Sequence, residues 1–421
     1  MHILFYNIFL FLYTLAIRLV APFNPKAKLW LEGRKNIFEK ISAALANNTA
    51  PLVWFHCASL GEFEQGRPLM EAYKIQYPQH KILLTFFSPS GYEVQKNYKG
   101  ADYRFYLPMD SKLSAKKFLS ITRPSLIIFI KYEFWYYFIS QIKHNDIPLL
   151  LVSGIFRKGQ PFFKWYGKLH QYMLQCFTHF FLQNQSSAKL LESLHMNNFT
   201  ISGDTRFDRV LAIRDKNEFL PEIAQFCEDK QIIVAGSTWS EDDEELDHYT
   251  HTHPGMRFII APHEISEERL QECKKLYHNA IFYSEYLKNN TAALHNTNTL
   301  IIDNIGMLST LYRYATVSYV GGGFGGDGVH NVLEAAVYGK PVIFGPVYEK
   351  YYEAVNLINS GGGFSVEDAL ELEAQLNNLL SNASDYTTAS LASENYVQEN
   401  GGATKKIMEY ILSNHNYHNK Q

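Results

Sequence analysis

The chain has 421 residues, of which 46% are hydrophobic, 15% aromatic and 19% charged. This length suggests two or three domains, and the composition is that of a globular protein with a sizeable core. The formal net charge of −3 argues against a protein that binds nucleic acid by charge alone. The four cysteines are scattered without a C-x-x-C pair, so zinc and redox motifs are not indicated and a reducing compartment fits.

The first apolar run is ILFYNIFLFLYTLAI, residues 3 to 17, and a group of basic residues follows it. A secretory signal has the opposite order, with cations before the apolar run. The run is shorter than the ~20 residues of a comfortable span. We predict a membrane-associated helix within residues 1–21 that either crosses the bilayer or lies in its interface, with the bulk of the chain in the cytoplasm. The alternative is a helix packed on the protein's own core.

The rest of the chain alternates short, apolar, β-branched runs with stretches of helix length. The runs that predict strands are 51–58, 81–88, 103–108, 125–132, 148–155, 179–184, 199–204, 231–238, 257–262, 280–284, 299–303, 316–322 and 341–345. This pattern is typical of parallel sheets covered on both faces. The pattern breaks near residues 205–230, so we predict an α/β protein with two doubly wound domains, 22–215 and 216–421. Such sheets bind ligands at the carboxyl ends of their strands, which places the expected site in a cleft between the domains.

The segment GGGFGGDGVHNVLEAA, residues 321 to 336, is a glycine-dense loop that leads into an expected helix. Bare backbone at a helix start favours an anion such as a phosphate. The glycines match G-x-G-x-x-G, but the acidic residue of a dinucleotide site and the Walker-A lysine are both missing. The loop therefore predicts a nucleotide site of another kind. The alternative is a loop whose glycines serve tight packing alone.

His330 and Glu334 are four residues apart, so we expect them to share one face of that helix near its start. A carboxylate there can accept hydrogen bonds from a ribose diol. The alternative is a first-turn glutamate that complements the helix dipole. The acidic run EDDEE, residues 241 to 245, likewise fits a first helical turn better than a metal site.

A second informative stretch is FHCASLGEFEQGRPL, residues 55 to 69, where a strand ends, a turn follows and a helix begins. Ser59 and Glu62 have the spacing of a capping box, which is a sufficient structural role. Glu62 also follows the carboxyl end of the first strand, where a carboxylate can take a proton from a sugar hydroxyl. Spacing alone leaves both roles open.

Seven motifs follow one another over nearly the whole length of the chain: HCASLGE, SPSGYE, YLPMD, EFW, GDTRFD, AGSTWSEDDE and GGDGVHNVLEAAVYGKPVIFGP. In this order they resemble the 3-deoxy-D-manno-octulosonic acid (Kdo) transferases of lipopolysaccharide synthesis. The resemblance implies a GT-B fold, with two Rossmann-like domains and the active site between them. It implies transfer of Kdo from CMP-Kdo to a lipid A precursor at the cytoplasmic face of the inner membrane. It also implies inversion at the anomeric centre, with no cofactor and no divalent metal.

The resemblance assigns roles to particular residues of this chain. Glu62 matches the family's general base, which deprotonates the acceptor hydroxyl. The positions that match the family's CMP-binding segments are Pro262 and His263, then Ile305, Gly306 and Met307, and finally Asn331, Val332, Leu333 and Glu334. The late glycine loop would then hold the cytidylate end of the donor.

Two positions depart from the family pattern in the catalytic set. Lys131 stands where a transition-state-stabilising glutamate is expected, and Arg206 stands where a lysine is expected. Two cations can hold the Kdo carboxylate and the leaving phosphate. Alternatively, Lys131 pairs with Glu133 or Glu64 and has a structural role only.

Two further departures affect the binding segments. His263 replaces an arginine, which puts the phosphate contact of that segment in doubt. Residues 153–157 read SGIFR where the family has a different motif, so that part of the site is not carried over.

Two other functions stay open at this stage. One is a GT-B transferase that uses a UDP-hexose, and the other is a non-catalytic sugar-nucleotide-binding membrane protein. The first differs in its donor, and the second differs in making no use of the Glu62 carboxylate.

Overall fold

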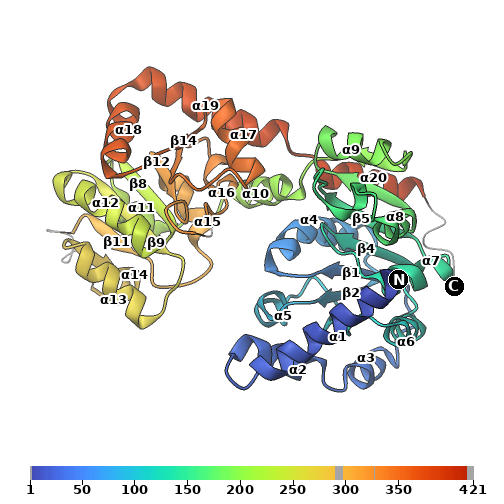
Figure 1. Cartoon of the computed structure of the whole chain (residues 1–421). Helices are drawn as coiled ribbons and strands as arrows, with labels where there is room; N and C mark the ends of the chain where they lie inside the picture. Colours follow the sequence, from blue (N-terminus) through green and yellow to red (C-terminus); the bar gives the residue numbers. More distant parts are fainter. Residues whose placement is uncertain (1, 290–296, 327, 415–421) are drawn as a thin grey trace. The chain divides into compact units, whose positions relative to one another are not determined.

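The computed structural model describes residues 2–289, 297–326 and 328–414. It divides into two compact units, as far as their residues are described: Met1–Arg209 with Gly402–Gln421, and Val210–Gly401. We call them unit 1 and unit 2 and describe each by itself (Figure 1).

Unit 1 is built on a seven-stranded sheet in which every neighbouring pair is parallel. Its strand order is β3-β2-β1-β4-β5-β6-β7. The strands are β1 Leu52–Cys57, β2 Lys81–Phe86, β3 Tyr103–Tyr106, β4 Leu126–Ile130, β5 Leu149–Gly154, β6 His179–Leu182 and β7 Phe199–Ile201. The helices are α1 His2–Val20, α2 Pro25–Arg34, α3 Ile37–Leu45, α4 Leu60–Gln76, α5 Pro89–Gln95, α6 Lys112–Thr122, α7 Tyr136–His144, η1 Pro161–Phe163, α8 Lys168–Gln175, α9 Gln185–Glu192 and α20 Ala403–Ser413.

Unit 2 repeats the plan, again with parallel neighbours throughout. Its strand order is β10-β11-β9-β8-β12-β13-β14. The strands are β8 Ile232–Thr238, β9 Arg257–Pro262, β10 Ala280–Phe282, β11 Thr299–Ile301, β12 Val317–Val320, β13 Val342–Phe344 and β14 Gly363–Ser365. The helices are α11 Pro221–Cys227, α12 Ser240–Thr252, α13 Glu267–Leu276, α14 Tyr283–Asn289, α15 Leu308–Leu311, η3 Tyr312–Tyr314, α16 Leu333–Ala336, α17 Tyr352–Ser360, α18 Ala369–Ser381 and α19 Ala383–Glu399; α10, Thr205–Asp215, runs from unit 1 into unit 2.

The sequence explains why these runs become central strands. All side chains of β1, β4 and β5 are buried, because helices cover both faces of a parallel sheet. Two apolar clusters result in unit 1, one centred on Trp54 and the other on Phe55, its neighbour on the opposite face. The thirteen predicted strands and the two doubly wound units are confirmed, while β14 was not predicted.

The predicted domain limits need one correction. The first unit is not a single continuous stretch that ends near residue 215. The last helix of the described chain, α20, also belongs to it. Helix α20 has an apolar face, and Ile407, Met408 and Ile411 are buried in the same cluster as Phe55. Burial of this apolar face holds α20 against unit 1. The alternation of strands and helices along the sequence does not predict this contact.

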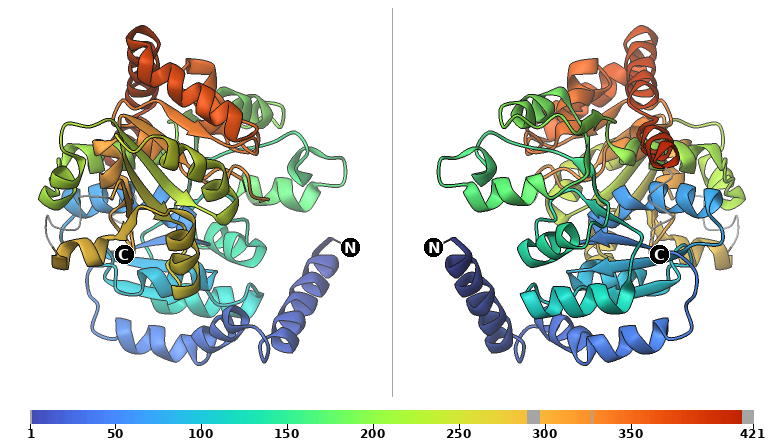
Figure 2. Two further views of the ribbon diagram at one scale, coloured as in Figure 1. Left: turned by 90° about the vertical axis from the view of Figure 1, so that its left-hand side faces the viewer. Right: turned by 90° about the vertical axis from the view of Figure 1, so that its right-hand side faces the viewer.

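Helix α1 is longer than the predicted apolar run and is mostly exposed. Within the described part of the chain it is long and apolar enough to cross a membrane by length and composition. Tyr6, Leu10 and Tyr13 form a narrow stripe at helical spacing that contacts unit 1. Most of the remaining apolar side chains are exposed, so packing on the protein's own core does not account for this helix. Figure 2 shows it as the dark blue helix at the edge of unit 1.

Candidate functional site

Each sheet has a topological switch point, where ligands of open α/β sheets bind. In unit 1 the strand order reverses between β1 and β4, and in unit 2 it reverses between β8 and β12. Glu62 and Lys131 follow the first pair of strands, and the glycine loop follows β12. Glu62, Lys131 and the glycine loop therefore lie at the two places where the topology favours a site, while the other predicted residues lie at or after the carboxyl ends of β7, β9 and β11.

Glu62 lies in the first turn of α4, directly after β1. One of its carboxylate oxygens, Oε2, accepts a hydrogen bond from the backbone N–H of Ser59 at 3.0 Å. The capping role is therefore real, and the side chain is only partly buried. A carboxylate oxygen has lone pairs beyond one such bond, so the cap leaves the group able to accept a further proton.

The environment of Glu62 raises its pKa to about 7. Burial is the main cause, and the nearby Glu133 carboxylate adds to it. Hydrogen bonds from Ser59 and Ala58 and the charge of Lys131 act in the opposite direction. A carboxylate with a pKa near the working pH meets the requirement for a general base.

Glu133 belongs to a buried hydrogen-bonded chain that the sequence did not reveal. Its Oε2 atom accepts from the indole N–H of Trp135 at 2.6 Å and lies 2.8 Å from Nε2 of His56. The other ring nitrogen of His56 lies 2.8 Å from the hydroxyl of Thr85. The available signal was the place of Glu133, two residues after Lys131 at the carboxyl end of β4.

The charges of Lys131 and Arg206 both act on the carboxylate of Asp204. Lys131 has a left-handed backbone, with φ of 66°, and its charge acts on both Glu62 and Asp204. Arg206 donates to Asp204 through its backbone N–H and its guanidinium, at 2.8–2.9 Å. Burial acts to raise the pKa of Asp204, but Arg206 lowers it below its usual value. Asp204 thus fixes the orientation of Arg206.

At the switch point of unit 2, three rings stack at the carboxyl ends of β8 and β9 and beside the glycine loop. His263 lies over His330, with centroids 4.3 Å apart and planes 14° apart, and over Trp239 at 4.7 Å. The indole N–H of Trp239 donates to Nε2 of His330 at 3.1 Å. Sequence reasoning named both histidines but missed Trp239, whose place directly after β8 was the usable signal.

The glycine loop is held by its neighbours in the fold. A side chain at Gly321 would meet the carbonyl oxygen of Ser237, and one at Gly323 would lie 2.5 Å from the backbone nitrogen of Gly345. Asp242 accepts from the N–H of Gly322 at 2.8 Å and so ties the loop to α12. Packing therefore accounts for the first glycines of the loop.

Gly325 and Gly326, in the middle of the loop, are not explained by packing, whereas a side chain at Gly328 would meet Tyr351 and the carbonyl of Val347. A Cβ at Gly326 would meet nothing within 4 Å among the described residues, and one at Gly325 would make only ordinary contact. The predicted anion-binding role is therefore limited to Gly325 and Gly326 and no longer includes the whole loop.

The helix after the loop differs from the prediction. It is a single turn that begins at Leu333, so His330 precedes it and does not share a helix face with Glu334. The N–H of His330 instead donates to the carbonyl of Gly321, which folds the chain back before the helix starts. Asn331 donates to Glu334 at 2.9 Å and accepts from the N–H of Leu333.

The other predicted CMP residues are placed as follows. Ile305 is 84% exposed and Gly306 has φ of 104°, in the segment after β11, directly before α15. Pro262 is buried at the end of β9. Val332 and Leu333 are fully buried, so neither offers its side chain to a ligand.

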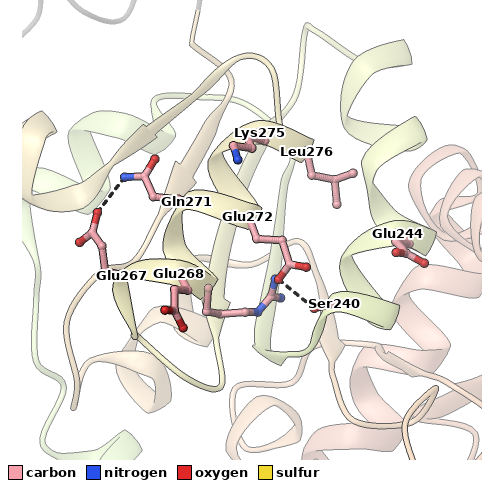
Figure 3. A pocket seen from close by; sticks show the side chains of 9 residues that line it. Ser240, Glu244, Glu267, Glu268, Gln271, Glu272, Lys275 and Leu276 are labelled. Atoms are coloured by element: carbon pink, nitrogen blue, oxygen red, sulfur yellow. Dashed lines mark hydrogen bonds and ion pairs between the residues drawn. The ribbon is translucent and has the colours of Figure 1, made fainter.

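A separate cavity of about 640 Å³ lies between α12 and α13 in unit 2 (Figure 3). Its wall is rich in carboxylates, and Ser240 donates to Glu272 across it at 2.9 Å. The predicted CMP residues do not line it, and its acidic wall does not suit a phosphate. It is therefore separate from the predicted donor site.

Comparisons with known proteins agree with the motifs. The family model for 3-deoxy-D-manno-octulosonic-acid transferases matches residues 34–209. The 3-deoxy-D-manno-octulosonic acid transferase of Aquifex aeolicus is 28% identical over 355 residues, 82% of this chain and 90% of that protein. The same-named protein of Haemophilus influenzae is 25% identical over 379 residues, 85% of this chain and 86% of that protein.

Solved structures share the fold at lower identity. UDP-GlcNAc 2-epimerase from Neisseria meningitidis has a TM-score of 0.62 at 15% identity and covers 87% of this chain and 100% of its own. A glycosyltransferase from Rickettsia africae has a TM-score of 0.56 at 16% identity, with the same coverage. Two doubly wound units of parallel strands are the architecture that this chain shares with both structures. In sequence, the chain is similar to the Kdo transferases over most of its length.

Proposed function

We propose that the protein transfers Kdo from CMP-Kdo to a lipid A precursor. The carrying observation is Glu62, a half-buried carboxylate at a switch point whose pKa is raised to about 7. Near neutral pH a large share of it is ionised, and its conjugate acid is weak enough to retain the proton it removes. Glu62 would take the proton of an acceptor hydroxyl while the oxygen attacks the anomeric carbon of Kdo. CMP leaves from the opposite side, so the anomeric configuration inverts.

Cations and backbone amides would replace a metal ion at the leaving group. CMP carries one phosphate, which is a smaller charge to stabilise than a diphosphate. Arg206, oriented by Asp204, and Lys131 supply positive charge in unit 1. They are suited to hold the carboxylate of the Kdo ring, which stays negative throughout the reaction.

Unit 2 would bind the donor through residues at the ends of β9, β11 and β12. Glu334 would accept from the ribose hydroxyls, and Asn331, which donates to it, fixes its orientation. Gly325 and Gly326 offer the open backbone for the phosphate. His263 would take the place of the family's arginine, with His330 and Trp239 as its support.

We further propose that α1 lies in the interface of the inner membrane, on its cytoplasmic side. A helix of this length could cross the bilayer, since 19 residues reach roughly 28 Å. Its contacts argue against that: Tyr6 donates to Asp110 at 2.6 Å, and Tyr137 donates to Asn7 at 2.8 Å. A crossing helix would carry the Asp110 carboxylate into hydrocarbon, which is costly.

A donor panel tests this function. Purified protein is incubated with a lipid A precursor and either CMP-Kdo or a set of UDP-hexoses. We expect turnover of CMP-Kdo alone. Turnover of a UDP-hexose without turnover of CMP-Kdo would favour the second kind of GT-B transferase. Binding of CMP-Kdo without product would favour a non-catalytic sugar-nucleotide-binding protein.

A further inference from the structure

The segment between β5 and α8, residues 155–167, presents one large aromatic side chain to solvent. Trp165 is 91% exposed, and its neighbour Tyr166 is 47% exposed. The same segment is anchored by Phe156 and Phe162, which are buried in the core of unit 1. Trp165 is therefore exposed on a segment whose Phe156 and Phe162 side chains are packed into the core.

The tip that carries Trp165 is closed by its own backbone. The N–H of Lys164 donates to the carbonyl of Pro161, and the N–H of Gly167 donates to the carbonyl of Lys164. A side chain at Gly167 would collide with the carbonyl oxygen of Pro161, so this closure requires glycine. The fold keeps the tip in one shape and holds the indole outward.

The stretch of chain that carries the tip has charge of one sign. The sequence contains no aspartate or glutamate between Asp146 and Glu192. Over the same stretch there are five cations: Arg157, Lys158, Lys164, Lys168 and Lys189. Tryptophan and tyrosine with flanking cations are the side chains that concentrate where a bilayer meets water. Lysine and arginine near that surface are attracted to anionic lipids.

The tip also lies beside the membrane helix. His2, at the start of α1, is close enough to His170 for its charge to act on that ring. His170 in turn stands edge-on to Phe162 at 5.5 Å. In both views of Figure 2 the green segment before α8 lies next to the N-terminal end of α1.

We propose that residues 157–168 form a second membrane contact, in which Trp165 enters the headgroup region of an anionic phospholipid bilayer. This inference rests on the proposed interfacial position of α1 and extends that surface across unit 1. Two contacts fix the rotation of unit 1 on the membrane, which one helix alone would leave free. The occupant is the lipid surface, because the charge and the continuity with α1 both favour it over a protein.

Tryptophan quenching tests the proposal with the full-length protein. Vesicles of phosphatidylcholine and phosphatidylglycerol contain phospholipids brominated on their acyl chains. Bound wild-type protein should lose fluorescence, and Trp165→Phe should abolish at least half of that loss at the same bound fraction. The double variant Lys158→Gln/Lys164→Gln should weaken binding to these vesicles about tenfold. A matched pair on α20, Lys405→Gln/Lys406→Gln, should not.

The possible failures are distinguishable. If wild-type protein does not sediment with the vesicles, the membrane location of α1 and this second contact both fall. If it sediments but Trp165→Phe is quenched as strongly as wild type, only the second contact falls. If Trp165→Phe instead changes the molecular mass in light scattering, the tip binds another copy of the chain, and the lipid proposal is overturned.

Discussion

At the residue scale, Glu62 combines a cap with the proposed base. Glutamine satisfies the same capping position, so Glu62→Gln preserves the bond from Ser59 while it removes the ability to take a proton. We expect a 10²- to 10⁴-fold loss of kcat with little change in thermal stability. Initial rates and a melting curve of the same preparation check this.

Glu71→Gln on the same helix is the matched control, since Glu71 pairs with Arg67 and accepts from the Tyr98 hydroxyl and is not a predicted site residue. It should retain wild-type rates. A Glu62→Gln enzyme that keeps its melting temperature and its rate would leave Glu62 as a helix cap alone.

The raised pKa of Glu62 predicts a pH profile. The base must be ionised, so kcat/KM should rise with pH with its midpoint near 7 and level off at higher pH. Lys131→Gln removes a charge that lowers this pKa and should move the rising limb to higher pH. Glu133→Gln removes a charge that raises it and should move the limb to lower pH. Shifts in the same direction for both variants would show that another group titrates.

At the element scale, the glycine loop separates packing from binding. Gly323→Ala would force a Cβ against the backbone of Gly345 and should lower the free energy of unfolding by about 1–3 kcal/mol. Gly326→Ala has open space, so its stability should stay within about 0.5 kcal/mol of wild type. If the open part of the loop approaches the donor, Gly326→Ala should raise the KM for CMP-Kdo several-fold. An unchanged KM would show that the open part of the loop does not approach the donor.

The elements that the sequence could predict are those whose pattern is local. Buried parallel strands are apolar throughout, so thirteen of them stand out from the helices between them. Strand β14 was not predicted because it has three residues and its one buried residue is Gly363, which has no side chain to give an apolar signal. Helix α16 begins later than predicted, because the N–H of His330 donates to the carbonyl of Gly321 and so belongs to the loop.

The candidate site was predictable to the same extent. Glu62 and the glycine loop could be predicted from the sequence, because each follows an apolar strand and belongs to a recognisable motif. The chain from Glu133 to His56 joins residues 77 positions apart across two paired strands, and only the sheet register brings them together. The stack of Trp239, His263 and His330 likewise depends on the adjacency of β8, β9 and β12.

At the scale of the whole molecule, α1 should decide where the protein resides. Phe5, Phe9 and Leu12 are exposed, outside the stripe that contacts unit 1. Burial of such a side chain is worth roughly 1.5–3 kcal/mol. Replacing all three by asparagine should lower partition into vesicles at least about 100-fold, while transfer to an acceptor in detergent persists. Leu370→Asn, at an exposed apolar position of unit 2, is the control for sedimentation. Unchanged partition of the triple variant would contradict the interfacial helix.

The central claim is that this chain uses Glu62 to place Kdo on a lipid acceptor. Mass spectrometry of products from CMP-Kdo and a tetraacylated glucosamine disaccharide tests it most directly, with wild-type and Glu62→Gln protein side by side. We predict the acceptor mass increased by one or more Kdo units with wild type and unmodified acceptor with Glu62→Gln. Unmodified acceptor with both proteins, or equal product with both, would contradict the account.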